Sequence, residues 1–117
     1  MAVVYNTTID QGADWFFTVT YADPSGTPII ITDYSAKMQM RVEPNSPTAV
    51  LTLTTDDGSI TINGPAGELN LHATAAQTGA IDEGPYVYDL EITSPAPEET
   101  VTRLVQGQII VSAEVTH

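Results

Sequence analysis

Carboxylates are the residues of this sequence most suited to chemistry, and two adjacent pairs of them, Asp56–Asp57 and Asp82–Glu83, are the candidates considered first. The 117-residue chain has 15 Asp and Glu against three Lys and Arg. Asp56–Asp57 and Asp82–Glu83 could in principle support acid–base or glycosidase chemistry, or bind calcium. Both pairs belong to turn sequences, DDGS and DEGP, and neither has the alternating oxygen-ligand spacing of a calcium loop. We therefore expect both pairs to be solvated turn residues.

A second group of carboxylates lies on the polar side of the strand-like stretch GPYVYDLEIT. If AKMQMRVE is its antiparallel neighbour, Lys37 and Arg41 come to lie beside Asp89 and Glu91. Opposite charges across two strands stabilise a sheet by on the order of a few tenths of a kcal/mol per pair. We expect structural cross-strand charge pairs here in preference to a catalytic carboxylate site. The same pairing predicts these inward residues: Met38, Met40, Val42, Tyr86, Tyr88, Leu90 and Ile92.

Other catalytic patterns are missing from the sequence. There is no Cys, and the two His residues, His72 at a strand end and His117 at the chain end, lack the partners of a metal site or a Ser-His-Asp arrangement. No GxGxxG, GxxxxGK or GxSxG occurs. We predict a protein that is not an enzyme and that uses no cofactor.

The charge balance limits the partners. A formal net charge of -12 repels the phosphates of nucleic acid and the anionic headgroups of lipid, so we expect neither nucleic acid nor a membrane as a partner. The N-terminus lacks the pattern of a signal peptide, and no apolar run approaches the roughly 18 residues of a membrane span. We expect a soluble protein made in the cytosol.

Nearly every segment alternates apolar and polar residues, which is typical of half-buried strands. We predict one domain over residues 1–117, with an all-β fold of about eight or nine strands in an immunoglobulin-like two-sheet antiparallel sandwich. A closed barrel is the alternative. One short helical turn is expected near 74–80, between the two sheets. The predicted strands are 15–21, 28–32, 36–43, 49–55, 59–63, 68–72, 84–93 and 101–115.

Three local expectations follow from the strand pattern. Alternation places Trp15 in the core and Phe16 on the opposite face, where Phe16 covers a docking surface or packs under the N-terminal segment. The segments 49–55, 59–63 and 68–72 are expected to form a meander. In the last strand the apolar phase becomes ambiguous at Gly107, which predicts a bulge or a change of sheet there.

Several stretches together resemble a known group of proteins. They are FFTVTYADPSGTPIIITDYSAKMQMRV, LTLTTDDGSITI, GELNLHATAAQTGAI, GPYVYDLEIT and VTRLVQGQIIVS. In this order they are similar to small tailed-bacteriophage and prophage structural proteins, in particular the immunoglobulin-like N-terminal domain of siphophage baseplate upper proteins. The resemblance covers nearly the whole chain and rests on fold-forming positions. In those proteins a stalk and receptor-binding scaffold follow the domain, whereas this sequence ends directly after its last strand.

The resemblance implies a virion structural protein with no catalytic residues, made in the bacterial host cytoplasm and incorporated into the particle. We expect an adaptor of the tail, baseplate or neck that docks on a symmetric ring, in contact with other virion proteins in many copies. The alternatives are a capsid decoration protein and, from another class, a carbohydrate- or receptor-binding module. We expect residues 2–8 and 112–117 to be the docking arms, and the candidate docking residues are Ala2, Val3, Val4, Tyr5, Phe16 and Val115.

Overall fold

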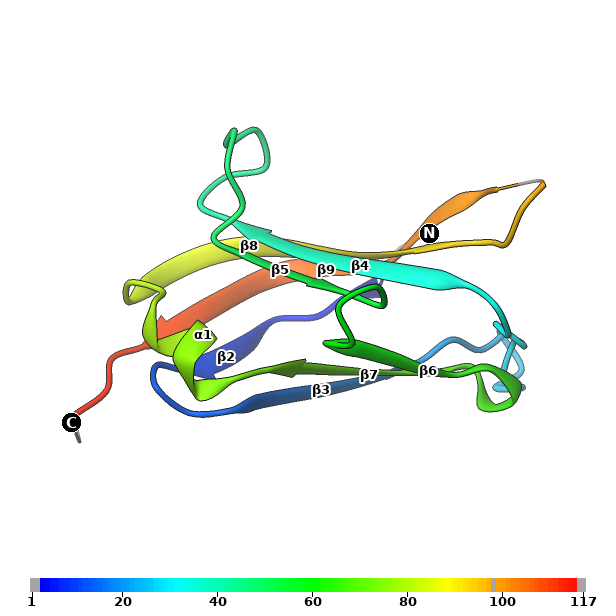
Figure 1. Ribbon diagram of the computed structural model, residues 1–117, viewed down its shortest axis with the longest axis horizontal. Coiled ribbons are helices and arrows are strands. Elements are labelled where there is room, and N and C mark those ends of the chain that lie inside the picture. Colours follow the sequence, from blue (N-terminus) through cyan, green and yellow to red (C-terminus); the bar gives the residue numbers. More distant parts are fainter. Residues whose placement is uncertain (1–2, 98, 116–117) are drawn as a thin grey trace.

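Two β-sheets pack face to face, with a short helix joining them at one end (Figure 1). The computed structural model describes residues 3–97 and 99–115. The larger sheet has the order β1-β9-β8-β4-β5, with β2 also paired to β9, and the smaller sheet has the order β3-β7-β6. The strands are β1 (Val3–Val4), β2 (Thr7–Asp10), β3 (Trp15–Thr20), β4 (Ser35–Arg41), β5 (Leu51–Thr54), β6 (Ile60–Asn63), β7 (Glu68–Ala73), β8 (Gly84–Thr93) and β9 (Val101–Ser112).

The strand connections are those of an immunoglobulin-like sandwich, as predicted. The smaller sheet matches the B-E-D strands of that fold, and β9-β8-β4-β5 match G-F-C-C′. At the start of β8 the hydroxyl of Tyr86 donates to the carbonyl oxygen of Asp82 at 2.7 Å, in the manner of a tyrosine corner. One feature departs from the expected antiparallel pattern, because β1 and β2 run parallel to β9.

The core lies between the inner faces of the two sheets. It follows from the alternation of the sequence, since inward residues of β4 and β8 are buried and their neighbours are not. Burying one large aliphatic side chain stabilises a fold by about 1.5–3 kcal/mol. The largest fully buried side chains are Ile9, Ile31, Met38, Met40, Leu53, Ile60, Leu69, Leu71, Leu90, Ile92, Ile109 and Val111.

The predicted helical turn is confirmed as α1 (Ala75–Gly79), which connects β7 of the smaller sheet to β8 of the larger one. Thr74 caps it. The Thr74 side chain accepts from the backbone N–H of Gln77, and the Gln77 side chain accepts from the backbone N–H of Thr74. This capping box satisfies two of the backbone donors that a helix start leaves free.

Two predicted strand arrangements are wrong. Residues 28–32 form no strand, only an isolated bridge between Ala22 and Pro28, since Pro28 has no N–H with which to continue a ladder. The segment is held instead by single backbone bonds, from Ile29 N to Tyr21 O and from Ile31 N to Gly64 O. The middle of the chain is not a meander either, because β5 pairs with β4 in the larger sheet while β6 and β7 lie in the smaller.

Two predictions about single residues are also wrong. Val42 is not inward: it follows the end of β4 and is 58% exposed. Gly107 marks neither a bulge nor a change of sheet, because β9 stays paired with β8 on both sides of it. The bulge lies at Leu104, the residue left unpaired between the Leu90–Val105 and Glu91–Arg103 partners.

Candidate functional site

The outer face of the larger sheet carries the expected charged residues, in a partly different arrangement. Lys37 lies directly opposite Glu91 on β8, as predicted. Arg41 lies opposite Val87, so its predicted place beside Asp89 is wrong. Its guanidinium turns toward the loop after β4, where it donates to the carbonyl oxygen of Ser46 at 2.8 Å.

Asp89 pairs instead with Arg103, a partner that the strand pattern did not reveal. The Arg103 Nε lies 3.4 Å from Asp89 Oδ2, and a second guanidinium nitrogen donates to Gln106 Oε1 at 3.1 Å. The bulge at Leu104 explains this contact. One extra residue in β9 reverses the alternation, so that Leu104 and Val105 are both buried and Arg103 is exposed on the same side as Gln106. All three basic residues of the chain therefore lie on β4 and β9.

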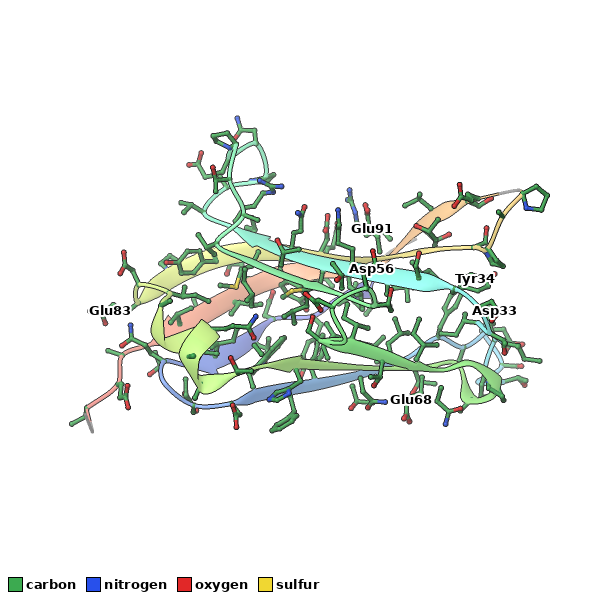
Figure 2. The ribbon with its side chains drawn as sticks, in the orientation of Figure 1. Asp33, Tyr34, Asp56, Glu68, Glu83 and Glu91 are labelled. Carbon is green, nitrogen blue, oxygen red and sulfur yellow. The ribbon has the colours of Figure 1, made fainter. Side chains whose placement is uncertain are left out.

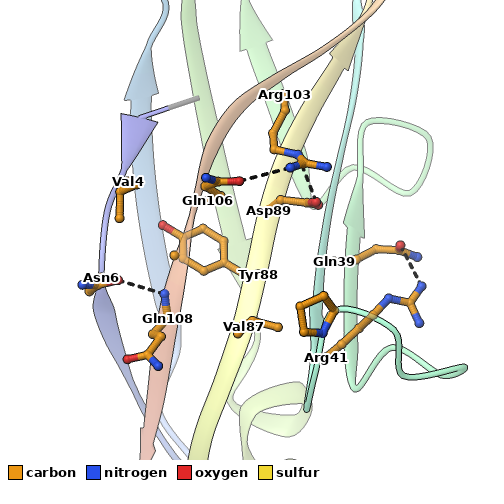
Figure 3. Close-up of a pocket in the computed structure, with 12 residues that line it drawn as sticks. Val4, Asn6, Gln39, Arg41, Val87, Tyr88, Asp89, Arg103, Gln106 and Gln108 are labelled. Atoms are coloured by element: carbon orange, nitrogen blue, oxygen red, sulfur yellow. Dashed lines mark hydrogen bonds and ion pairs between the residues drawn. The ribbon is translucent and has the colours of Figure 1, made fainter. Parts of the chain in front are cut away.

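These side chains surround a pocket of about 500 Å³, which we call the polar pocket (Figure 3). Asn6, Gln39, Gln106 and Gln108 contribute amides, Arg41 and Arg103 contribute guanidinium groups, and Asp89 contributes a carboxylate. Val4, Pro44 and Val87 add apolar surface, and the backbone of Gly107 completes the lining together with Tyr88. The loop 43–50 stands above the sheet at this point (Figure 1), and Pro44 of that loop belongs to the lining.

A second depression, the edge groove, runs along the open side of the sandwich between β3 and the β1–β9 edge. Its volume is about 550 Å³. Val3, Tyr5 and Phe16, three of the predicted docking residues, line it. Val3 is 64% exposed and Phe16 is 70% exposed, so large apolar side chains meet solvent here. Phe16 faces away from the core, as predicted, and stacks on His72 with ring centroids 4.5 Å apart.

The inner wall of the edge groove is an aromatic cluster that holds the N-terminal segment in place. Tyr5 stacks on Phe17 at 5.3 Å, and Phe17 in turn stacks on Trp15 at 5.4 Å. The Tyr88 hydroxyl donates to the carbonyl oxygen of Tyr5 at 2.6 Å. Burial raises the pKa of Tyr88 to about 12, with a smaller contribution from Tyr5. The neutral, hydrogen-bonded form of this phenol is therefore the one that the fold stabilises.

The remaining docking residues are not brought to the same place. Val4 projects to the other side of β1 and lines the polar pocket. Val115 is 90% exposed, follows the end of β9 and lines neither depression. Ala2 lies outside the described residues. The structure thus unites Val3, Tyr5 and Phe16 and separates Val4 and Val115 from them.

The carboxylates in the turns after β5 and β3, Asp57 and Asp23, accept hydrogen bonds from residues of their own turns. Asp57 accepts hydrogen bonds from the hydroxyl and the backbone N–H of Ser59, and these bonds lower the pKa of Asp57. Asp23 is similar, since bonds from Ser25 and Thr27 lower its pKa. Asp56 and Glu83 lie far apart in Figure 2, so the pairs Asp56–Asp57 and Asp82–Glu83 do not meet. Within residues 3–97 and 99–115, no three His, Asp or Glu side chains come together in a way that could hold a metal ion.

Comparisons with protein-family models and with curated proteins found no relative of this chain. No protein-family model matches the chain, and no curated protein matches its sequence. Among the described residues, no helix has the length and apolar character needed to cross a membrane.

Proposed function

We propose that this chain is a non-enzymatic structural protein of a bacteriophage virion, an adaptor that docks on a symmetric ring of the tail, baseplate or neck. Its partners in this role are other virion proteins, met in many copies. The chain is made in the cytoplasm of the bacterial host and then built into the particle. The resemblance of its strand and turn sequences to siphophage baseplate upper domains supports this role, and the immunoglobulin-like sandwich agrees with that resemblance.

The observation that carries the proposal is the edge groove. Phe16 and Val3 are mostly exposed although they are large and apolar, and they line one groove together with Tyr5. Clustered exposed apolar residues on a folded protein are typical of a surface that another protein covers. Among the strands of residues 3–97 and 99–115, β3 pairs only with β7, so its second edge has no ladder partner there and a strand of a neighbouring protein can add to it.

Cryo-electron microscopy of the native particle that contains the chain tests this proposal. We expect density for the sandwich in a ring at the tail, baseplate or neck, with the edge groove facing its neighbour. Copies spread over the icosahedral shell would instead indicate capsid decoration. Absence of the chain from every purified particle would contradict a virion role altogether.

A charge placed in the edge groove tests the docking surface itself. Phe16→Asp should reduce incorporation of the chain into particles by at least about tenfold, because burying an unpaired carboxylate at an interface opposes association. Val42→Asp is the matched control, since Val42 is also apolar and exposed but lines neither depression. Both variants should fold, as each changes an exposed side chain. Equal incorporation of the two variants would show that docking uses another surface.

A further inference from the structure

The polar pocket carries an inference that is independent of the virion proposal. We propose that it is a binding site for a neutral saccharide, with Gln39, Arg41, Asp89, Gln106 and Gln108 as its contacts to sugar hydroxyls. These five residues come from three neighbouring strands, β4, β8 and β9, and all of them line the same depression (Figure 3).

The chemistry of the lining fits a polyol. A sugar hydroxyl both donates and accepts, so it is best bound by planar groups that offer two neighbouring polar atoms. Amides offer both donors, on the NH₂ group, and an acceptor, on the carbonyl oxygen, whereas a guanidinium offers only donors and a carboxylate only acceptors. The polar pocket contains all three kinds, with amides from Asn6, Gln39, Gln106 and Gln108. A site for a phosphate or a carboxylate would instead contain mainly donors.

The polar groups are held in place before any ligand arrives. Arg41 is fixed between Ser46 O at 2.8 Å and Gln39 Oε1 at 3.0 Å. Arg103 is fixed by Asp89 at 3.4 Å and by Gln106 at 3.1 Å. A group that is already ordered loses less conformational entropy on binding than a free side chain does.

Unused hydrogen-bonding capacity remains after these contacts. Arg41 uses two of its five N–H donors on described residues. The side-chain amide of Gln108 makes no hydrogen bond to any residue in the described part of the chain, although its backbone N–H donates to Asn6 Oδ1 at 2.9 Å. These free donors and acceptors point to a polar ligand.

The dimensions and the apolar residues also suit a sugar ring. A volume of about 500 Å³ lies within the roughly 300–1,000 Å³ of small-molecule sites. Val87 stands between the polar groups of β4 and β9, in register with both Arg41 and Gln108, and offers apolar contact to the C–H groups of a ring. Pro44 adds a second apolar contact from the loop after β4.

The charge of the whole molecule, and not that of the lining, favours a neutral saccharide over an acidic one. The lining has two guanidinium groups, Arg41 and Arg103, and one carboxylate, Asp89, so its own net charge is +1. The rest of the molecule brings the total to -12. That field opposes the approach of any anion and leaves an uncharged polyol unaffected.

Nuclear magnetic resonance of the ¹⁵N-labelled full chain tests the site. The probes are a panel of neutral sugars, namely maltose, cellobiose, lactose and N-acetylglucosamine, with glucuronate as the acidic comparison. We expect at least one neutral sugar to shift the side-chain amide signals of Gln39, Gln106 and Gln108 with a Kd of about 1 mM. The site is refuted if all four neutral sugars leave these signals unmoved at about 50 mM, or if glucuronate alone moves them.

Variants separate this site from adventitious sugar contact. Gln108→Ala should weaken binding of the responding sugar by about tenfold through loss of hydrogen bonds, without altering the fold, because its side chain makes none within the described chain. Arg41→Gln should weaken it at least as much. Thr61→Ala on the outer side of β6 is the control and should bind normally. Unchanged affinity in both pocket variants would assign the shifts to another surface and overturn the proposal.

Discussion

At the scale of single residues, Gly107 decides how the N-terminal segment meets the larger sheet. A Cβ atom at this position would overlap the carbonyl oxygen and carbon of Tyr5. Gly107 lies opposite Tyr88 on β8, and the Tyr88 hydroxyl reaches the same Tyr5 carbonyl. The absence of a side chain on β9 therefore lets the segment between β1 and β2 lie directly on the strand.

Gly107→Ala should destabilise the protein by about 1–3 kcal/mol, since the added methyl must displace backbone atoms. Urea unfolding followed by circular dichroism measures the change in free energy. Gly79→Ala is the control, because its Cβ would meet only Gly12 at the ordinary contact distance of 3.7 Å. A loss at Gly107 no larger than that at Gly79 would contradict the close approach.

The raised pKa of Tyr88 predicts how the free energy of unfolding depends on pH in the alkaline range. Its pKa is raised from 10.0 to about 12, so the fold favours the neutral phenol. The stabilisation is complete below pH 10 and is lost as the pH rises through about 12. Tyr88→Phe removes this contribution, and its stability should fall less steeply than that of the unchanged protein between these values.

Urea midpoints measured at several pH values from neutral to alkaline follow this dependence. At neutral pH, Tyr88→Phe should be less stable by about 1 kcal/mol, because the Tyr5 carbonyl loses its donor. Parallel alkaline slopes for the two proteins would mean that another group governs the loss.

At the scale of elements, α1 ties the two sheets together at one end through Thr78. This residue is fully buried. Its hydroxyl donates to the carbonyl oxygen of Ala13 at 2.8 Å and accepts from the backbone N–H of Gly12 at 3.1 Å. The helix thus supplies the hydrogen bonds of the turn between β2 and β3.

Thr78→Val should destabilise the fold by about 2 kcal/mol, since it preserves the shape but leaves the Gly12 and Ala13 groups without their partner. Thermal unfolding of this variant measures the loss. Thr78→Ser keeps the hydroxyl and should recover most of the stability. If the serine variant is as unstable as the valine variant, the hydroxyl is not the stabilising group.

Elements with a clear period were predictable from the sequence, and irregular ones were not. The alternation in β4 and β8 is strict, so the pairing of these strands and their buried sides were predicted correctly. The ATAAQTG pattern identified α1. The sequence pattern did not reveal the bulge, because Leu104 and Val105 are both apolar and β9 could therefore alternate in either phase. That one ambiguity also concealed the contact between Arg103 and Asp89, and with it the contribution of Arg103 to the polar pocket. Parallel pairing of β1 and β2 with β9 has no local sequence signal at all.

At the scale of the whole molecule, the excess of carboxylates is spread over turns and outer faces, while the basic residues lie only on β4 and β9 of the larger sheet. Repulsion among these carboxylates opposes the compact state.

The candidate docking residues could be chosen from the sequence as exposed apolar positions. Their grouping could not, because Val3 of β1 and Phe16 of β3 come to line the same groove only through the packing of the two sheets.

Because the excess carboxylates repel one another, added salt should stabilise the folded protein. Raising sodium chloride from about 0.01 M to about 0.15 M shortens the screening length from roughly 30 Å to roughly 8 Å. We expect Tm to rise by about 4 °C, equivalent to about 1 kcal/mol for a domain of this size. Calorimetry at the two concentrations measures the shift, and sucrose at equal osmolality is the control. A Tm that falls with salt would mean that attractive pairs outweigh the net repulsion.

The parallel pairing of β1 and β2 with β9 also sets the order of events in folding. Asn6 and Gln108, which hydrogen-bond to each other, are 102 positions apart in the chain. β1 and β2 are therefore synthesised well before β9, and they cannot pair with it until the roughly 100 residues between them have been made. Contacts of such long sequence separation form slowly, because a large loop must close first. During that interval Val3 and Val4 are open to other chains, so a newly made molecule is most vulnerable to misassembly just before β9 arrives.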